Sequence, residues 1–82
     1  MVIIEYSEKG GSFMECKVSL TWDEEAYVWL ASSDDVPGLA LESGSLDALM
    51  ERVKIAIPDL LDLKDTDLKI DFQAERLAQV HV

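Results

Sequence analysis

The sequence predicts a small α+β domain in which one helix covers one face of an antiparallel-rich sheet. Two segments of alternating apolar and polar residues predict strands, and an apolar stripe at helical spacing between them predicts a helix. A chain of 82 residues has room for one core. We therefore expect a two-layer domain in the order (β)βββαβ, in which the strand in brackets is an edge strand at the N-terminus.

The first long strand is predicted from Met14 to Trp22, because every second residue there is apolar and the residues between are polar. Residues 23–26 supply a turn, and the aromatic and β-branched composition of Tyr27 to Ser32 predicts the returning strand. A loop with Pro37-Gly38 follows, since Pro fixes φ and Gly tolerates a positive φ. A short third strand, Leu39 to Glu42, comes next.

The helix should begin after Ser45, a natural N-cap, with Asp47 in its first turn. Its apolar stripe consists of Leu46, Leu49, Met50, Val53, Ile57, Leu60 and Leu61. Pro58 removes one backbone hydrogen bond, but the stripe keeps its phase across this residue. We therefore expect one kinked helix that ends at residues 65–67.

The two ends of the chain are less regular. Leu68 to Ala74 alternates again and predicts the last strand, and a bulge near Arg76 would let Val80 and Val82 resume the same phase. Residues 1–12 contain a strand-like segment followed by Gly10-Gly11, so we interpret them as an N-terminal extension or edge strand. The main domain is then residues 13–82.

The net charge of the chain indicates which classes of partner it could bind. The chain carries 17 Asp and Glu against seven Lys and Arg, a net charge of −10. Because nucleic-acid binding depends on cationic side chains, we expect no direct binding to nucleic acid or to an anionic membrane. A basic protein would be attracted, although the charge can equally serve solubility alone. A single cysteine and the lack of a leader or long apolar segment favour a cytoplasmic protein.

No residue pattern points to catalysis or to a cofactor. His81 lies next to the C-terminal residue, where a base has no fixed orientation, and Cys16 lies on the apolar side of its strand, as a buried thiol would. Asp34-Asp35 and Asp65-Thr66-Asp67 are the candidates for a two-metal nuclease. Both lie in expected turns, where Asp is favoured for its backbone hydrogen bonds. We therefore expect no enzyme, no cofactor and no metal.

Residues 18–57 resemble the HicB-like antitoxin domain. The resemblance rests on the predicted hairpin, on the turn Asp35-Val36-Pro37-Gly38 and on a helix that starts soon after a serine, here Ser45. It is strongest to a short, uncharacterised branch that lacks the DNA-binding segment of full-length HicB antitoxins. The resemblance implies a partial ribonuclease-H-like fold, self-association, and a role in masking a small basic HicA-type toxin that cleaves RNA.

Two residues are candidates for the centre of a protein interface. Trp29 is one, because Trp is enriched at such centres, with ordinary sheet packing beside Trp22 as the alternative. Ile55 is the other, because a helical wheel places it opposite the apolar stripe, among Glu51, Arg52, Asp59 and Asp62. Asp35, Pro37 and Gly38 are expected to shape a structural loop.

An open sheet face and an exposed strand edge predict a homodimer. The function that the sequence favours is a non-enzymatic, antitoxin-like binding module. Two alternatives stay open: a structural or regulatory interaction module without a toxin, and a degenerate metal-dependent nuclease.

Overall fold

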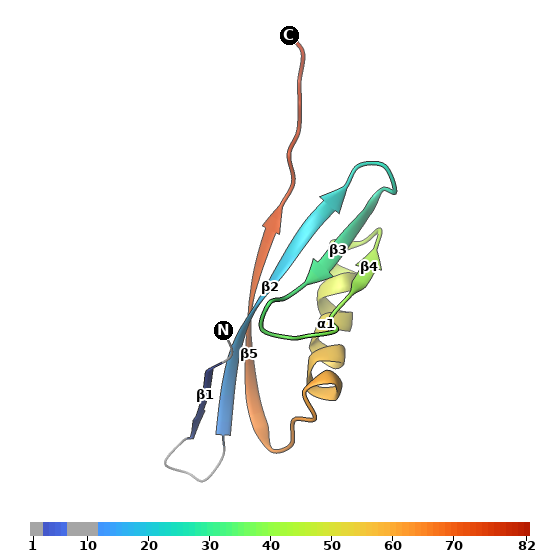
Figure 1. Ribbon diagram of the computed structural model, residues 1–82. Helices are drawn as coiled ribbons and strands as arrows, with labels where there is room; N and C mark the ends of the chain where they lie inside the picture. The colour runs from blue at the N-terminus through green and yellow to red at the C-terminus, as the bar shows by residue number, and fades with distance from the viewer. Residues whose placement is uncertain (1–2, 7–11) are drawn as a thin grey trace.

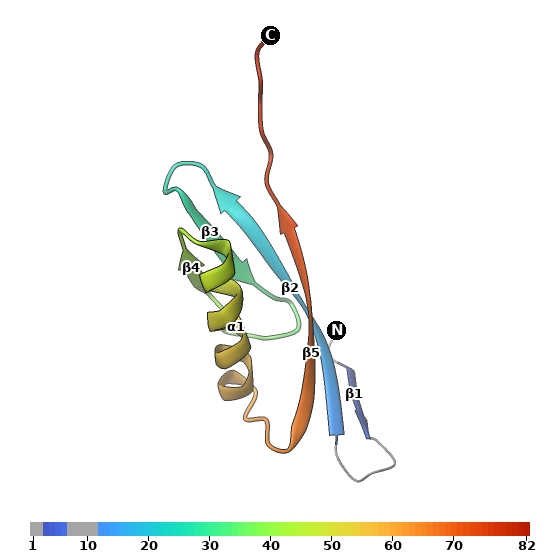
Figure 2. The same cartoon turned by 180° about the vertical axis from the view of Figure 1, so that it is seen from behind.

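The computed structural model describes residues 3–6 and 12–82, and its elements follow the expected order (Figure 1). They are β1 (Ile3–Tyr6), β2 (Ser12–Asp23), β3 (Val28–Ser32), β4 (Leu41–Ser43), α1 (Leu46–Leu60) and β5 (Thr66–Glu75). The strands form one five-stranded sheet, and α1 lies on one of its faces, as Figure 2 shows from behind. The predicted two-layer α+β fold with one helix is confirmed.

The sheet is built around β2, which pairs with three other strands. β5 runs parallel to β2 from the pair Ser12–Thr66 to the pair Thr21–Glu75. β1 pairs antiparallel with the first residues of β2, and β3 pairs antiparallel with its last residues. Because a strand has two edges, β1 and β3 share the edge opposite β5 and lie end to end. β4 pairs antiparallel with β3 and completes the sheet on that side.

The direction of β5 follows from the connection that precedes it. The chain passes from β4 through α1 before it enters β5, and parallel strands need such a crossover, usually a helix. The sheet is therefore mixed, with one parallel strand pair among antiparallel ones.

The core lies between α1 and the sheet. Alternate residues of β2 and one stripe of α1 are at most 1% exposed; they are Met14, Cys16, Val18, Leu20, Leu49, Val53 and Ile57. Burying an aliphatic side chain of this size contributes roughly 1.5–3 kcal/mol, so these two rows hold the layers together. They are the rows that the alternation and the helical stripe predict.

The helix begins as expected and ends soon after its proline. Ser45 is the N-cap: its Oγ accepts a hydrogen bond from the Ala48 amide at 3.2 Å. Asp47 lies in the first turn. Pro58 lies inside the last turn, and the helix ends at Leu60, short of the expected boundary. The Leu61 amide still donates to the Ile57 carbonyl at 3.0 Å and closes the helix.

Turn geometry shifts two of the predicted strand boundaries. Tyr27 has a φ of +56° and belongs to the turn after β2, so β3 begins at Val28. Asp23 closes this turn, because its Oδ1 accepts hydrogen bonds from the amides of Glu25 and Ala26. The third predicted strand is displaced to Leu41–Ser43, because Leu39 still belongs to the preceding loop, where its amide donates a hydrogen bond to the Val36 carbonyl at 3.2 Å.

Of the predictions for the two ends of the chain, one is confirmed and one is wrong. The predicted N-terminal edge strand is confirmed, since β1 pairs with β2 from Ile3–Glu15 to Tyr6–Ser12. The Gly10-Gly11 turn lies outside the described residues. The predicted resumption of the last strand is wrong: β5 ends at Glu75, and residues 76–82 form no strand. Pairing with β2 stops there, and the C-terminal segment extends beyond the sheet (Figure 1).

Candidate interaction surface

The loop between β3 and β4 replaces a missing strand. Lys17 of β2 lies between the stretch paired with β1 and the stretch paired with β3. Its amide donates to Asp35 Oδ2 at 2.8 Å, and its carbonyl accepts from the hydroxyl of Ser33. The Asp35 amide in turn donates to Ser33 Oγ at 3.1 Å. Since an unpaired backbone group at this position would destabilise the sheet, these two side chains complete its hydrogen bonding.

The geometry of the loop explains its Asp-Val-Pro-Gly sequence. Asp35 is 6% exposed and is anchored to β2, whereas Asp34 is exposed. Val36 is fully buried and fills the core beneath the loop. Gly38 follows Pro37 with a φ of +87°, a conformation that side chains disfavour. The loop therefore depends on Asp35, Val36 and Gly38 for its shape.

The two residues predicted for a partner interface lie in different places. Trp29 is 9% exposed and packs against Trp22, with ring centroids 5.5 Å apart in an edge-to-face arrangement. Little of the Trp29 side chain is accessible to a partner, as expected if it serves sheet packing beside Trp22. Ile55 is 70% exposed on the solvent side of α1. The structure therefore does not bring them together.

Ile55 has both acidic and basic neighbours on the exposed side of α1. Glu51 and Asp59 lie one turn before and after it, and Asp62 follows the helix; all three are exposed. We call these four residues the acidic helix face. The basic residues of α1 are engaged nearby, since Lys54 pairs with Glu51 at 2.8 Å and Arg52 Nη1 donates to the Glu42 carbonyl at 2.9 Å.

The outer strand β5 is covered less well than the strand beside it. Leu68, Ile70 and Phe72 lie on the same face as the buried side chains of β2 but are only half-buried. The opposite face of β5 carries Asp67, Lys69, Asp71 and Gln73. Among the described residues no strand pairs with the outer edge of β5. We call this strand, with its half-buried apolar row, the β5 edge.

The open face of the sheet is largely polar. β2 presents Lys17, Ser19 and Thr21 there, next to the polar side chains of β5. Such a face is stable in water, so the apolar surface available for contact lies on the helix side instead.

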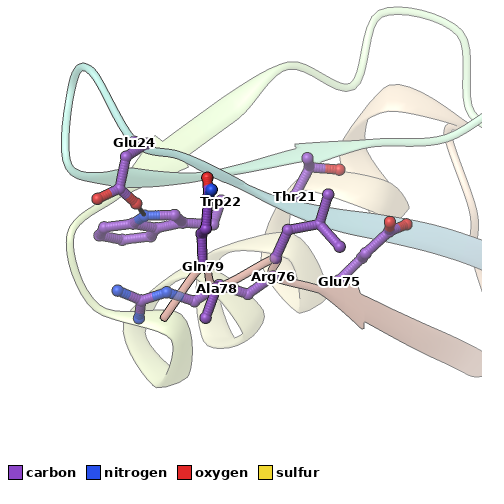
Figure 3. A pocket seen from close by; sticks show the side chains of 8 residues that line it. Thr21, Trp22, Glu24, Glu75, Arg76, Ala78 and Gln79 are labelled. Carbon is purple, nitrogen blue, oxygen red and sulfur yellow. Dashed lines mark hydrogen bonds between the residues drawn. The ribbon is translucent and has the colours of Figure 1, made fainter. Parts of the chain in front are cut away.

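A groove of about 880 Å³ lies where β2 and β5 end (Figure 3). It is lined by Thr21, Trp22, Glu24, Glu75, Arg76, Leu77, Ala78 and Gln79. The Arg76 guanidinium lies 4.0 Å from the centroid of the Trp22 ring, and the Trp22 indole donates to Glu24. This stacking holds the first residue of the C-terminal segment against the sheet, a contact worth about 0.5–1 kcal/mol at an exposed site.

Two of the side chains considered for chemistry, Cys16 and Asp35, lie near each other, and His81 lies apart from them in the C-terminal segment. Burial raises the pKa of the Cys16 thiol, and the carboxylates of Asp35 and Glu15 raise it further, so this thiol stays protonated and is a poor nucleophile. His81 is exposed in the C-terminal segment. Within residues 3–6 and 12–82, no three His, Cys, Asp or Glu side chains are grouped to hold a metal ion. No helix in the same residues is long and apolar enough to cross a membrane.

Two features of these surfaces could not be found from the sequence. Ser33 gives no signal, because serine is ordinary in a loop and its bond to Lys17 joins residues far apart in the chain. The β5 edge also gives none, because alternation predicts a strand without naming its neighbours. Only the observed pairing shows which edge is left open.

Comparisons with known proteins place the chain in a family. The model of a domain of unknown function, DUF1902, matches residues 15–82, which run from β2 to the C-terminus. A crystal structure of a hypothetical protein from the extremely thermophilic bacterium Thermus thermophilus is similar, with a TM-score of 0.68 and 36% sequence identity. The match covers 80% of this chain and 99% of that chain. No curated protein matches, and neither match is described as HicB. The chain thus belongs to the DUF1902 family, a family defined so far without a function.

Proposed function

We propose that this protein is a non-enzymatic binding module that masks a basic partner, and that the partner is a HicA-type toxin that cleaves RNA. The observation that supports this proposal is the acidic helix face, where Ile55 is 70% exposed among Glu51, Asp59 and Asp62. The resemblance of residues 18–57 to the HicB-like domain suggests the kind of partner.

The composition of this face suits a basic protein. Energetic centres of interfaces are apolar side chains that lose their contact with water, surrounded by a polar rim. Ile55 offers such a centre, and the exposed carboxylates of Asp59 and Asp62, with the Glu51–Lys54 pair beside them, offer a polar rim that is mostly acidic. The net charge of −10 would attract a cationic surface over a distance and speed association. Covering the RNA-binding surface of the toxin would inhibit it without any chemical step.

A graded inhibition assay tests the proposal. The purified toxin of the same host cleaves a labelled RNA while this protein is added in increasing amounts, and we expect inhibition to be complete near equimolar ratio. Ile55→Asp should raise the concentration needed by roughly 30-fold, the effect of losing about 2 kcal/mol at an interface centre. Leu77→Asp is the matched control: it makes the same chemical change at a site that is 85% exposed, and it should inhibit like the wild type.

The outcomes separate the competing functions. If the toxin is not inhibited but another basic protein is bound through Ile55, the toxin assignment is wrong and a different interaction module is indicated. If the protein itself cleaves nucleic acid with Mg²⁺ or Mn²⁺, and changing Asp34, Asp35 or Asp67 abolishes the cleavage, the binding module is wrong and a nuclease is indicated.

A further inference from the structure

The β5 edge is long enough to accept another strand. β5 pairs with β2 along its full length, from Thr66 to Glu75, and this pairing uses one of its two edges. Within residues 3–6 and 12–82 no strand pairs with the other edge. A long open edge is a template for pairing with another chain. Its half-buried row of Leu68, Ile70 and Phe72 would lose further contact with water if a strand were added.

The charge pattern of β5 identifies what would pair with it. Antiparallel pairing of β5 with its own copy, centred on Ile70, places Lys69 opposite the partner's Asp71, and this happens twice by symmetry. The same register places Leu68 opposite the partner's Phe72 on the apolar side. Opposite charges and apolar pairs directly across two strands both stabilise a sheet.

Neighbouring registers are less favourable. Centring on Lys69 places two lysines opposite each other, and centring on Asp71 does the same with two aspartates; like charges in these positions destabilise pairing. Centring on Phe72 pairs Lys69 with the partner's Glu75 but leaves Leu68 beyond the end of the partner's strand. Centring on Leu68 pairs Lys69 with the partner's Asp67 but leaves Phe72 beyond the start of the partner's strand and Ile70 opposite Thr66. Moving the centre of the pairing by one residue shifts the register by two residues. All of these registers therefore keep the apolar rows on one face, and they differ in which charges and apolar side chains lie opposite each other.

We propose that two copies of this chain associate through β5 in the register centred on Ile70 and form one continuous sheet. The pairing closes on itself, because each copy uses its open edge once and no β5 edge is left for a third. This surface is separate from the acidic helix face, so the dimer and the proposed partner are independent claims. Lys69 already lies 4.0 Å from Glu15 in the same chain, an exposed pair that leaves the ammonium accessible to a second carboxylate.

Reversing the charges at positions 69 and 71 tests the proposal. A chain with Lys69→Asp places aspartates opposite aspartates in its own dimer, and a chain with Asp71→Lys places lysines opposite lysines. Each variant alone should dimerise about 30-fold more weakly than the wild type, since two favourable cross-strand pairs become unfavourable. An equimolar mixture restores both opposite-charge pairs and should dimerise as the wild type does. Analytical ultracentrifugation over a concentration series measures all of these states.

Disulfide trapping tests the register. Directly opposed residues of an antiparallel pair have Cα atoms about 4.5–5.5 Å apart, within the range that a disulfide bridges. Ile70→Cys should therefore form a covalent dimer on mild oxidation. Phe72→Cys is the matched control: residue 72 would lie roughly 13 Å from its copy and should not cross-link. The wild type controls for Cys16, which is buried.

Three results would overturn the inference: a wild-type mass near 9.2 kDa at high protein concentration, a mixture of the charge variants that stays monomeric, or cross-linking by Phe72→Cys in place of Ile70→Cys. The charge variants lie on the polar face of β5, so circular dichroism should confirm that they fold. Toxin inhibition that persists in these variants would show that the proposed function stands or falls separately.

Discussion

Replacing Gly38 tests whether the loop between β3 and β4 holds the domain together as the structure indicates. Gly38 has a φ of +87°, and a residue with a side chain held there costs roughly 1–3 kcal/mol. A Cβ at this position would lie 3.8 Å from Leu60 Cδ2, an ordinary contact, so backbone strain and not a clash sets the cost. Gly38→Val should therefore lower the melting temperature by about 5–20 °C in a domain of this size.

Asp34→Ala is the matched control for this change. Asp34 is exposed in the same loop, and substitutions at such sites usually change stability by less than about 0.5 kcal/mol. The melting temperature of Gly38→Asn should lie between those of Gly38→Val and Asp34→Ala, because asparagine tolerates a positive φ better than other side chains. Thermal unfolding followed by circular dichroism gives all three values. Equal melting temperatures for Gly38→Val and Asp34→Ala would refute the role assigned to Gly38.

Three further predictions concern the helix cap, the thiol and the charge. Ser45→Ala should destabilise the protein by about 1 kcal/mol in urea unfolding and Ser45→Asp by much less, because an aspartate can still accept the Ala48 amide. Cys16 should resist a thiol reagent at pH 8 in the folded protein and react promptly in urea, since burial raises its pKa; prompt labelling of the folded protein would contradict its placement. The association rate with a basic partner should fall steeply as NaCl is raised from about 0.05 to about 0.5 M, as expected for screened charges, and a salt-independent rate would argue against charge steering.

Much of the fold follows from local patterns in the sequence. Alternation identifies β2 because Met14, Cys16, Val18 and Leu20 all have to face α1. The helix follows from its stripe and from Ser45, whose hydroxyl accepts a hydrogen bond from the Ala48 amide in the first turn. These predictions succeed because each depends only on residues close together in the chain.

The remainder depends on contacts between distant residues. Nothing in the alternation of β5 shows that it pairs parallel with β2, and the apparent phase of Val80 and Val82 suggests a strand that has no partner to pair with among the described residues. Trp29 is of a residue type that is common in interfaces, yet it is buried, because it lies opposite Trp22 in the sheet and packs against it. The exposure of Ile55 was predictable, because an isolated apolar residue opposite a helical stripe faces solvent.

Isothermal titration of the purified HicA-type toxin of the same host into this protein tests whether the acidic helix face binds the toxin. We expect a defined stoichiometry, binding by the wild type and by Leu77→Asp with equal affinity, and roughly 30-fold weaker binding by Ile55→Asp. Equal affinities for the wild type and Ile55→Asp would show that the acidic helix face is not the binding surface. No heat of binding and no inhibition with the wild type would contradict the toxin-masking function itself.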